Sequence, residues 1–215
     1  MRKERVSVYT HLAGVALAVA GTVFLAFTTR KSASLLGVSL IYGFSAIFLF
    51  SASSLYHAFK REEDEVSFWR KLDHLAIFFM IAGTYTPVCY AYLDGGWRWS
   101  IIGVQWALVL AGLFMKLFYL NAPRWLTAGV YVIMGWIAII PVHRLYGIMP
   151  ADALLYLALG GAAYTSGAII YAIERPRLLP GVFSFHELFH VLILLGGFFH
   201  FLLVYVAMTG ALNAA

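Results

Sequence analysis

The stretch FHELFHVLILLGGFFHFLLVYV, residues 185–206, joins two histidines and a glutamate to an apolar run long enough to cross a membrane. On an α-helix, residues four apart lie on one face, so His186 and His190 can present their imidazoles to the same metal ion. Titratable side chains inside a membrane span are costly and by default mark a functional site. The pair therefore predicts a metal site at the start of this segment; hydrogen bonding within a helix bundle is the structural alternative.

The composition of the whole chain is that of a membrane protein. Of its 215 residues, 62% are hydrophobic and 12% are charged, which lies far outside the range of soluble globular domains. No long polar linker or low-complexity tract interrupts the chain, so we expect a single domain over residues 1–215. The basic N-terminal residues are not followed by a small-residue cleavage site, and we expect the first apolar segment to be retained. The single Cys89 is expected to pack within an apolar helix.

Seven apolar segments are predicted to be transmembrane helices, because a spanning segment must satisfy its backbone polar groups internally. They cover approximately residues 7–28, 35–59, 72–92, 99–119, 126–142, 153–173 and 184–208. Each is long enough to cross a hydrocarbon core about 30 Å thick at about 1.5 Å per residue. The sequence thus predicts an all-α, polytopic bundle of seven transmembrane helices.

Lysine and arginine residues are divided unevenly between the two sides of this predicted bundle. The side of the N-terminus holds Arg2, Lys3, Arg5, Lys60, Arg61, Arg70, Lys71, Lys116, Arg124, Arg175 and Arg177, and the opposite side holds Arg30, Lys31, Arg98 and Arg144. By the positive-inside rule, the N-terminus is predicted to be cytoplasmic. This order accounts for the net charge of +5, and we expect no nucleic-acid partner.

Alternation of the spans brings distant polar residues to one side of the membrane. The second span ends with Ser53 and His57, the third begins with Asp73, and the seventh begins with His186 and His190. Three imidazoles with a fourth position left for water form a known catalytic zinc arrangement. We therefore expect a Zn²⁺ site made by these three histidines at the cytoplasmic side, with the serine and the aspartate beside it.

Three further side chains are candidates for catalytic roles. Asp73 is placed to act as a general base or to orient a zinc ligand, and its structural alternative is to complement the dipole at a helix N-terminus. Ser53 lies one turn before His57 on the same face; its alternative is to bond its own helix backbone. Glu187 completes the H-E-x-x-H spelling of zinc metalloproteases. However, it projects about 100° from His186 on a helix, so it acts as an acid or base, supports a ligand, or pairs with a cation at the membrane rim.

Taken in order, three motifs resemble those of the bacterial hemolysin III proteins. They are the serine and histidine of residues 53–57, the Leu-Asp-His of residues 72–74 leading into residues 81–87, and the H-E-x-x-H of residues 186–190. The hemolysin III proteins are in turn similar to the eukaryotic progestin and adipoQ receptors, which include the adiponectin receptors. The resemblance covers essentially the whole chain.

This resemblance implies a seven-helix protein of the bacterial cell (inner) membrane with a zinc ion near its cytoplasmic side. It maps the zinc ligands to His57, His186 and His190, and it places Asp73 and Ser53 around the zinc-bound water. A broader superfamily that includes alkaline ceramidases suggests hydrolysis of a lipid amide. The long N-terminal domain of the adiponectin receptors has no counterpart in this sequence, so hormone reception is not implied.

The favoured function is therefore a zinc-dependent hydrolase of a lipid-like amide or ester, with membrane lipids and a lipid-like small molecule as partners. The first alternative is a non-enzymatic, lipid-responsive protein of membrane homeostasis whose zinc is structural. An intramembrane metalloprotease is supported by the H-E-x-x-H spelling alone. A cytolytic function is suggested only by the name of the hemolysin III family.

Overall fold

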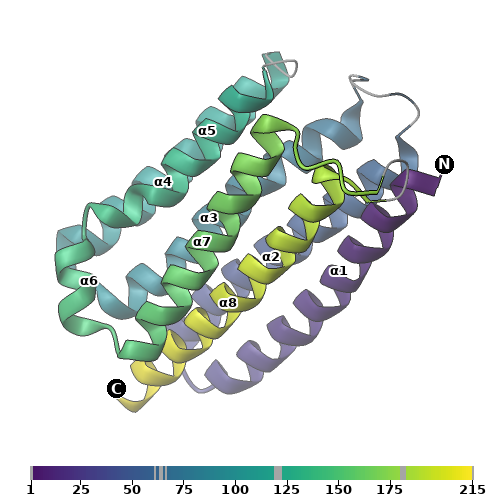
Figure 1. The fold of residues 1–215 in the computed structure, drawn as a ribbon. Helices are drawn as coiled ribbons and strands as arrows, with labels where there is room; N and C mark the ends of the chain where they lie inside the picture. The colour runs from purple at the N-terminus through teal and green to yellow at the C-terminus, as the bar shows by residue number, and fades with distance from the viewer. Residues whose placement is uncertain are drawn as a thin grey trace.

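The chain forms a bundle of long helices, described here from a computed structural model that covers residues 2–60, 62, 65, 67–118, 123–179 and 183–214. The helices are α1 (Arg2–Thr29), α2 (Ala33–Phe59), α3 (Phe68–Tyr92), α4 (Gly95–Phe118), α5 (Arg124–Gly135), the 3₁₀ helix η1 (Trp136–Ile139), α6 (Val142–Ile148), α7 (Ala151–Ile173) and α8 (Phe185–Asn213). The described residues contain no β-strand, only an isolated bridge between Leu179 and Phe183. The all-α prediction is confirmed (Figure 1).

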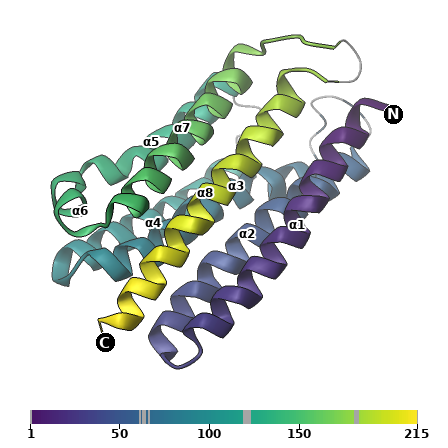
Figure 2. The ribbon, with the colours of Figure 1, turned by 60° about the horizontal axis from the view of Figure 1, so that its bottom comes forward.

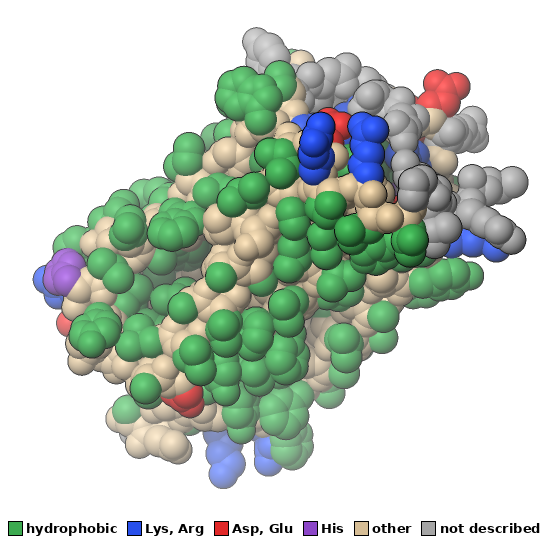
Figure 3. Space-filling view, in the orientation of Figure 1, with side chains coloured by type: hydrophobic (Ala, Val, Ile, Leu, Met, Phe, Trp, Pro, Cys, Tyr) green, Lys and Arg blue, Asp and Glu red, His purple; other side chains and the backbone are tan. Residues whose placement is uncertain are grey.

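Six of these helices are long and apolar enough to cross a membrane, and there are seven crossings if the bent segment from α5 to α6 counts as one. The six include all the predicted spans except the fifth, although the predicted end of the fourth span, Tyr119, lies outside the described residues. Hydrophobic side chains cover the middle of the visible face, with Lys and Arg near its ends (Figure 3). Cys89 is buried among apolar neighbours, as expected.

Serine residues fix where three of the helices begin. The hydroxyl of Ser32 accepts a hydrogen bond from Leu35 N, and that of Ser67 accepts one from Arg70 N. Such N-caps satisfy backbone N–H groups that have no partner within the helix. Ser184 occupies the same position before α8. The first residues of α3 and α8, which carry predicted site residues, are therefore set by their own local sequence.

The predicted fifth span, residues 126–142, is not one straight helix. The α-helix ends at Gly135, continues as η1, and meets α6 at an angle of 55°. Pro141 has no N–H with which to continue the helical ladder, and Ile140 N instead makes the tighter 3₁₀ bond to Ile137 O, at 3.0 Å. A second helix then begins, with Leu145 N donating to Pro141 O at 3.0 Å. The prediction of a continuous helix was wrong here.

A tyrosine from α3 supports the backbone at this break. The hydroxyl of Tyr85 donates to Gly135 O at 2.6 Å and accepts from Ala138 N at 2.6 Å. Irregular backbone at membrane depth is tolerated only where neighbouring groups satisfy its polar atoms. These two hydrogen bonds satisfy a backbone carbonyl and a backbone N–H where α5 passes into η1.

Helix α8 contacts α1, α2, α3 and α7. The two ribbon views show the helices running alternately up and down the bundle (Figures 1 and 2). As a result, the end of α2 and the starts of α1, α3 and α8 meet at one end of the molecule. The prediction that alternation of the spans brings the site-bearing helix ends to one side is therefore confirmed.

Close packing of α7 on α8 depends on two glycines in reciprocal positions. A Cβ atom at Gly160 of α7 would overlap the ring of His200 on α8, and a Cβ atom at Gly196 of α8 would lie 2.7 Å from the ring of Tyr164 on α7. Each helix thus supplies one glycine and, four residues later, one ring that fills the opposite recess. Small residues at such contacts let transmembrane helices approach closely.

We expect Gly160→Ala to destabilise the bundle by about 1–3 kcal/mol, because the added methyl group forces the His200 ring to move. The neighbouring Gly161 is a matched control, since a Cβ atom there would meet nothing within 4 Å. Gly161→Ala is expected to be neutral or slightly stabilising, as alanine favours helix. Thermal unfolding of both variants in detergent measures the difference. Equal melting temperatures would show that the α7–α8 interface relaxes around the methyl group.

Candidate metal centre

Helix α2 carries two of the predicted site residues in its last two turns. Ser53 is 4% exposed and His57 is 3% exposed, both on the face that is turned into the bundle. The helix ends at Phe59, where Lys60 N donates to Tyr56 O at 2.8 Å. His57 is thereby held at the end of a span and not at its middle.

Helix α8 carries His186 and His190 in its first two turns. The backbone N–H of Ser184 donates to Glu187 Oε2 at 2.7 Å, which is half of a capping box. Glu187 is 2% exposed and fixes the residue at which α8 begins. Because the start of the helix sets the direction of every later side chain, this carboxylate determines where both histidines point.

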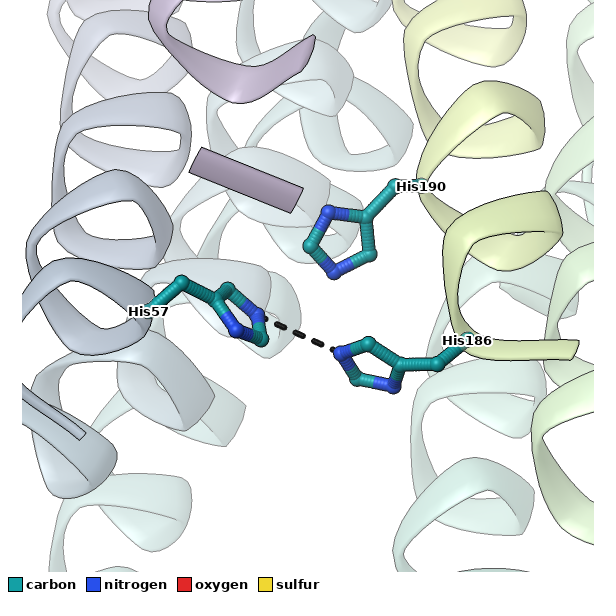
Figure 4. Close-up of side chains that lie close together, drawn as sticks. All are labelled: His57, His186 and His190. Carbon is teal, nitrogen blue, oxygen red and sulfur yellow. Dashed lines mark hydrogen bonds between the residues drawn. The ribbon is translucent and has the colours of Figure 1, made fainter. Parts of the chain in front are cut away.

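The three predicted ligands lie together, as Figure 4 shows. His57 Nε2 and His186 Nε2 are 3.3 Å apart. The ring of His190 lies 4.8 Å from that of His57 and 4.7 Å from that of His186, measured between centroids. One nitrogen from each residue lies within 4.8 Å of the others. Among the described residues, these three histidines form the group whose spacing could hold a metal ion.

The donor set and the distance between two of its nitrogens fit a tetrahedral zinc ion. Zinc binds imidazole nitrogen at about 2.0–2.1 Å, and two ligands at a tetrahedral angle are then about 3.3–3.4 Å apart. The separation of 3.3 Å between His57 and His186 agrees with this value. His190 is 1% exposed, and its Nδ1 has no hydrogen-bond partner among the described residues. A buried imidazole pointed at two others is the environment that a metal ion would complete.

Asp73 lies in the second turn of α3 and lines the same cavity as the three histidines. Its Oδ2 is 3.7 Å from Nδ1 of His74, which in turn lies 2.8 Å from Arg70 O. Tyr131 of α5 donates to His74 O at 3.0 Å. The side chains of Asp73 and His74 are neighbours in the cavity wall.

The histidines open onto a cavity of about 1060 Å³. Its walls come from α2, α3, the α5–α6 segment, α7 and α8, with His11 contributed by α1. The lining residues on α8 run from His186 to Leu203. At about 1.5 Å per residue, this stretch of helix is about 25 Å long. The lining is polar near the three histidines. Further in it is mostly apolar, with Ile193 and Leu203, but it also includes His200. Ser53 and Glu187 also line the cavity.

A fourth histidine, which the sequence did not assign to the site, packs against the third. His11 of α1 is 2% exposed, and its ring is stacked on that of His190 with centroids 3.9 Å apart. The signal in the sequence was a titratable residue within an apolar segment. What the sequence lacked was the identity of the neighbouring helix, because contact between the first and last spans is a property of the folded bundle.

Comparison with known proteins gives matches over nearly the whole chain. Residues 1–201 match the model of a protein family that is described as "Haemolysin-III related". The chain is 31% identical to Hemolysin-3 of Bacillus cereus over 98% of its own length and 95% of that protein. It is 33% identical to the Hemolysin-3 homolog of Bacillus subtilis (strain 168), covering 80% of this chain and 81% of that one. A rice protein, heptahelical transmembrane protein ADIPOR2, is 31% identical over 66% of this chain and 69% of its own length.

Proposed function

Because the chain belongs to the Haemolysin-III related family, we propose that its three histidines hold a zinc ion and that the protein is a metal-dependent hydrolase. Its substrate would be a lipid-like amide or ester. The observation that carries this proposal is the junction of three imidazoles with a cavity whose inner part is apolar. A site that only braced the bundle would need no such cavity beside it.

In this proposal His57, His186 and His190 would hold the ion, beside the cavity that they line. When bound there, zinc would acidify a water molecule and polarise the carbonyl group of a substrate. The capping box at Glu187 holds the two α8 ligands in register, and the end of α2 holds the third. Supports of this kind hold the histidine side chains in one orientation, so that the site does not rearrange when a substrate enters.

Asp73 and Ser53 supply the groups that handle protons in this scheme. Asp73 accepts the proton of the attacking water as general base, and its position in the cavity wall gives it access to the same space as the three histidines. Ser53, one turn from His57, donates a hydrogen bond that orients the water or the substrate carbonyl. The carboxylate of Glu187 is occupied by the helix cap, so the role of base falls to Asp73.

The shape of the cavity supports a lipid-like substrate. Beyond the histidines, the α8 wall from Ile193 to Leu203 is about 15 Å long and can lie along an acyl chain, while the polar end places an amide or ester group beside the histidines. The apolar wall also excludes water, which strengthens electrostatic interactions at the reacting group. We further propose that this polar end faces the cytoplasm of a bacterial cell, since most Lys and Arg residues belong to this side.

The test is metal-dependent release of fatty acid by the purified protein in detergent. Ceramide-like and phospholipid substrates are supplied to protein as isolated, after chelation, and after return of Zn²⁺. We expect chelation to remove the activity and zinc to restore it. Fatty-acid release that persists without metal would contradict the proposal.

A different result would favour the alternative function. If zinc raises the melting temperature of the protein but no substrate in either class is hydrolysed, the metal is structural. The protein would then be a lipid-responsive component of the membrane and not an enzyme.

A further inference from the structure

The buried side of α1 begins with two polar residues. Ser7 and His11 lie one helical turn apart and are both buried, whereas most of the surrounding residues on α1 are exposed or half-buried. Further along, the same side of the helix continues with Gly14, Thr22 and Leu25. At the end of the bundle that holds the three histidines, α1 therefore contacts α8 through an imidazole, His11 on His190.

The ring of His11 is held in one orientation by two aromatic neighbours. It is stacked on His190 with an angle of 20° between the ring planes, and Phe50 of α2 meets it edge-on at 5.4 Å and 83°. His190 in turn contacts His57 and His186 through its other sides. His190 thus contacts the flat face of His11 as well as the rings of the two other histidines.

The nitrogen atoms of His11 do not explain its position. Neither has a hydrogen-bond partner among the described residues, and both are buried. The spacing that brings one nitrogen each of His57, His186 and His190 together does not extend to His11. What the side chain offers its neighbour is therefore the face of its ring. Stacked aromatic rings have a preferred geometry, so such a contact restricts rotation of the partner ring.

We propose that His11 is a positioning residue of the metal centre, which acts by stacking on His190 and holding its imidazole toward His57 and His186. The proposal rests on the proposed metal site. It extends that site to α1, which contributes no ligand, and it makes the first helix of the chain part of the support for a ligand on the last.

The experiment compares two replacements of similar bulk in the full-length protein. His11→Leu fills the space but has no flat face, whereas His11→Phe keeps the flat face and removes the nitrogens. Co²⁺ serves as the probe metal, because its visible absorption bands report ligand geometry. We expect His11→Leu to bind Co²⁺ about 10- to 100-fold more weakly, with shifted bands, as is typical when a ligand loses its supporting contact. His11→Phe is expected to keep both the affinity and the bands of the wild type.

Two checks separate positioning from a general loss of structure. Each variant removes two buried nitrogens without partners, so metal-free protein should unfold at a temperature no lower than that of the wild type. His143→Leu, at an exposed histidine on α6 that does not line the cavity, should bind Co²⁺ normally.

Three results would overturn the proposal. Wild-type affinity and bands in His11→Leu would show that the stacking contact has no effect on His190. An equal loss in His11→Phe and His11→Leu would assign the effect to the nitrogens of His11 and not to its ring face. If the wild-type protein binds no Co²⁺, the proposed metal centre itself is wrong. This failure can be told apart from a failure of the His11 proposal, because it is seen in the wild type before any substitution is made.

Discussion

Purified His190→Ala protein is expected to contain no stoichiometric zinc. The wild type, loaded with Zn²⁺ and freed of excess, should retain about one ion per chain if its three imidazoles form a site of the usual kind. His190 touches both other ligands and is the most buried of the three. Its loss leaves two nitrogens, and the affinity should fall by more than the roughly 10- to 100-fold that follows from loss of a supporting contact.

Elemental analysis of His57→Ala, His186→Ala and His190→Ala beside the wild type gives the measurement. All three should lose the metal together, because each supplies one of only three ligands. His143→Ala is the control, as its side chain is exposed and packs edge-on against Trp97. Full zinc content in any of the three variants would remove that histidine from the site.

Asp73→Asn is expected to lower the rate of lipid hydrolysis by about 10²- to 10⁴-fold, the usual contribution of a general base. Asparagine has the size of aspartate and can still accept a hydrogen bond, but it cannot take up a proton from water. Zinc content and melting temperature should change little. If Asp73 served only to complement the dipole of α3, the effect would be a stability loss of about 0.3–1 kcal/mol with hydrolysis retained.

Glu187→Gln distinguishes this scheme from that of a metalloprotease. Glutamine can replace glutamate in a capping box, so α8 should begin at the same residue. A fall in hydrolysis as large as that of Asp73→Asn would assign the role of base to Glu187 and contradict the assignment to Asp73. Release of peptide from a membrane-embedded protein substrate, with lipid substrates untouched, would favour the protease reading.

Much of the fold follows from the hydropathy of the chain, because a spanning helix must be apolar over its whole length. In residues 126–142, however, hydropathy predicts the apolar span but not its bend. Hydropathy records that the segment is apolar but not that Pro141 interrupts its ladder or that Tyr85, over 50 residues earlier, satisfies the backbone at the break. That pairing is made in three dimensions and leaves no mark in the local pattern.

The three histidines were predicted from parity, since an even or odd number of crossings decides which span ends meet. Glu187 carries two local signals in the sequence. Its H-E-x-x-H spelling suggested acid–base chemistry, while the serine three residues before it, Ser184, already formed the capping-box pattern that the structure shows. His11 shows the limit of the method, because nothing in a sequence states that the first and last spans touch.

The three histidines are separated by most of the chain: His57 ends the second helix, whereas His186 and His190 begin the last. During synthesis, the ribosome must therefore translate more than 120 residues after His57 before a complete set of donors exists. If the three histidines hold an ion as proposed, it can be loaded only late in biogenesis, after the final hydrophobic segment has entered the bilayer. A nascent chain halted before that point would contain only one of the three proposed ligands, His57.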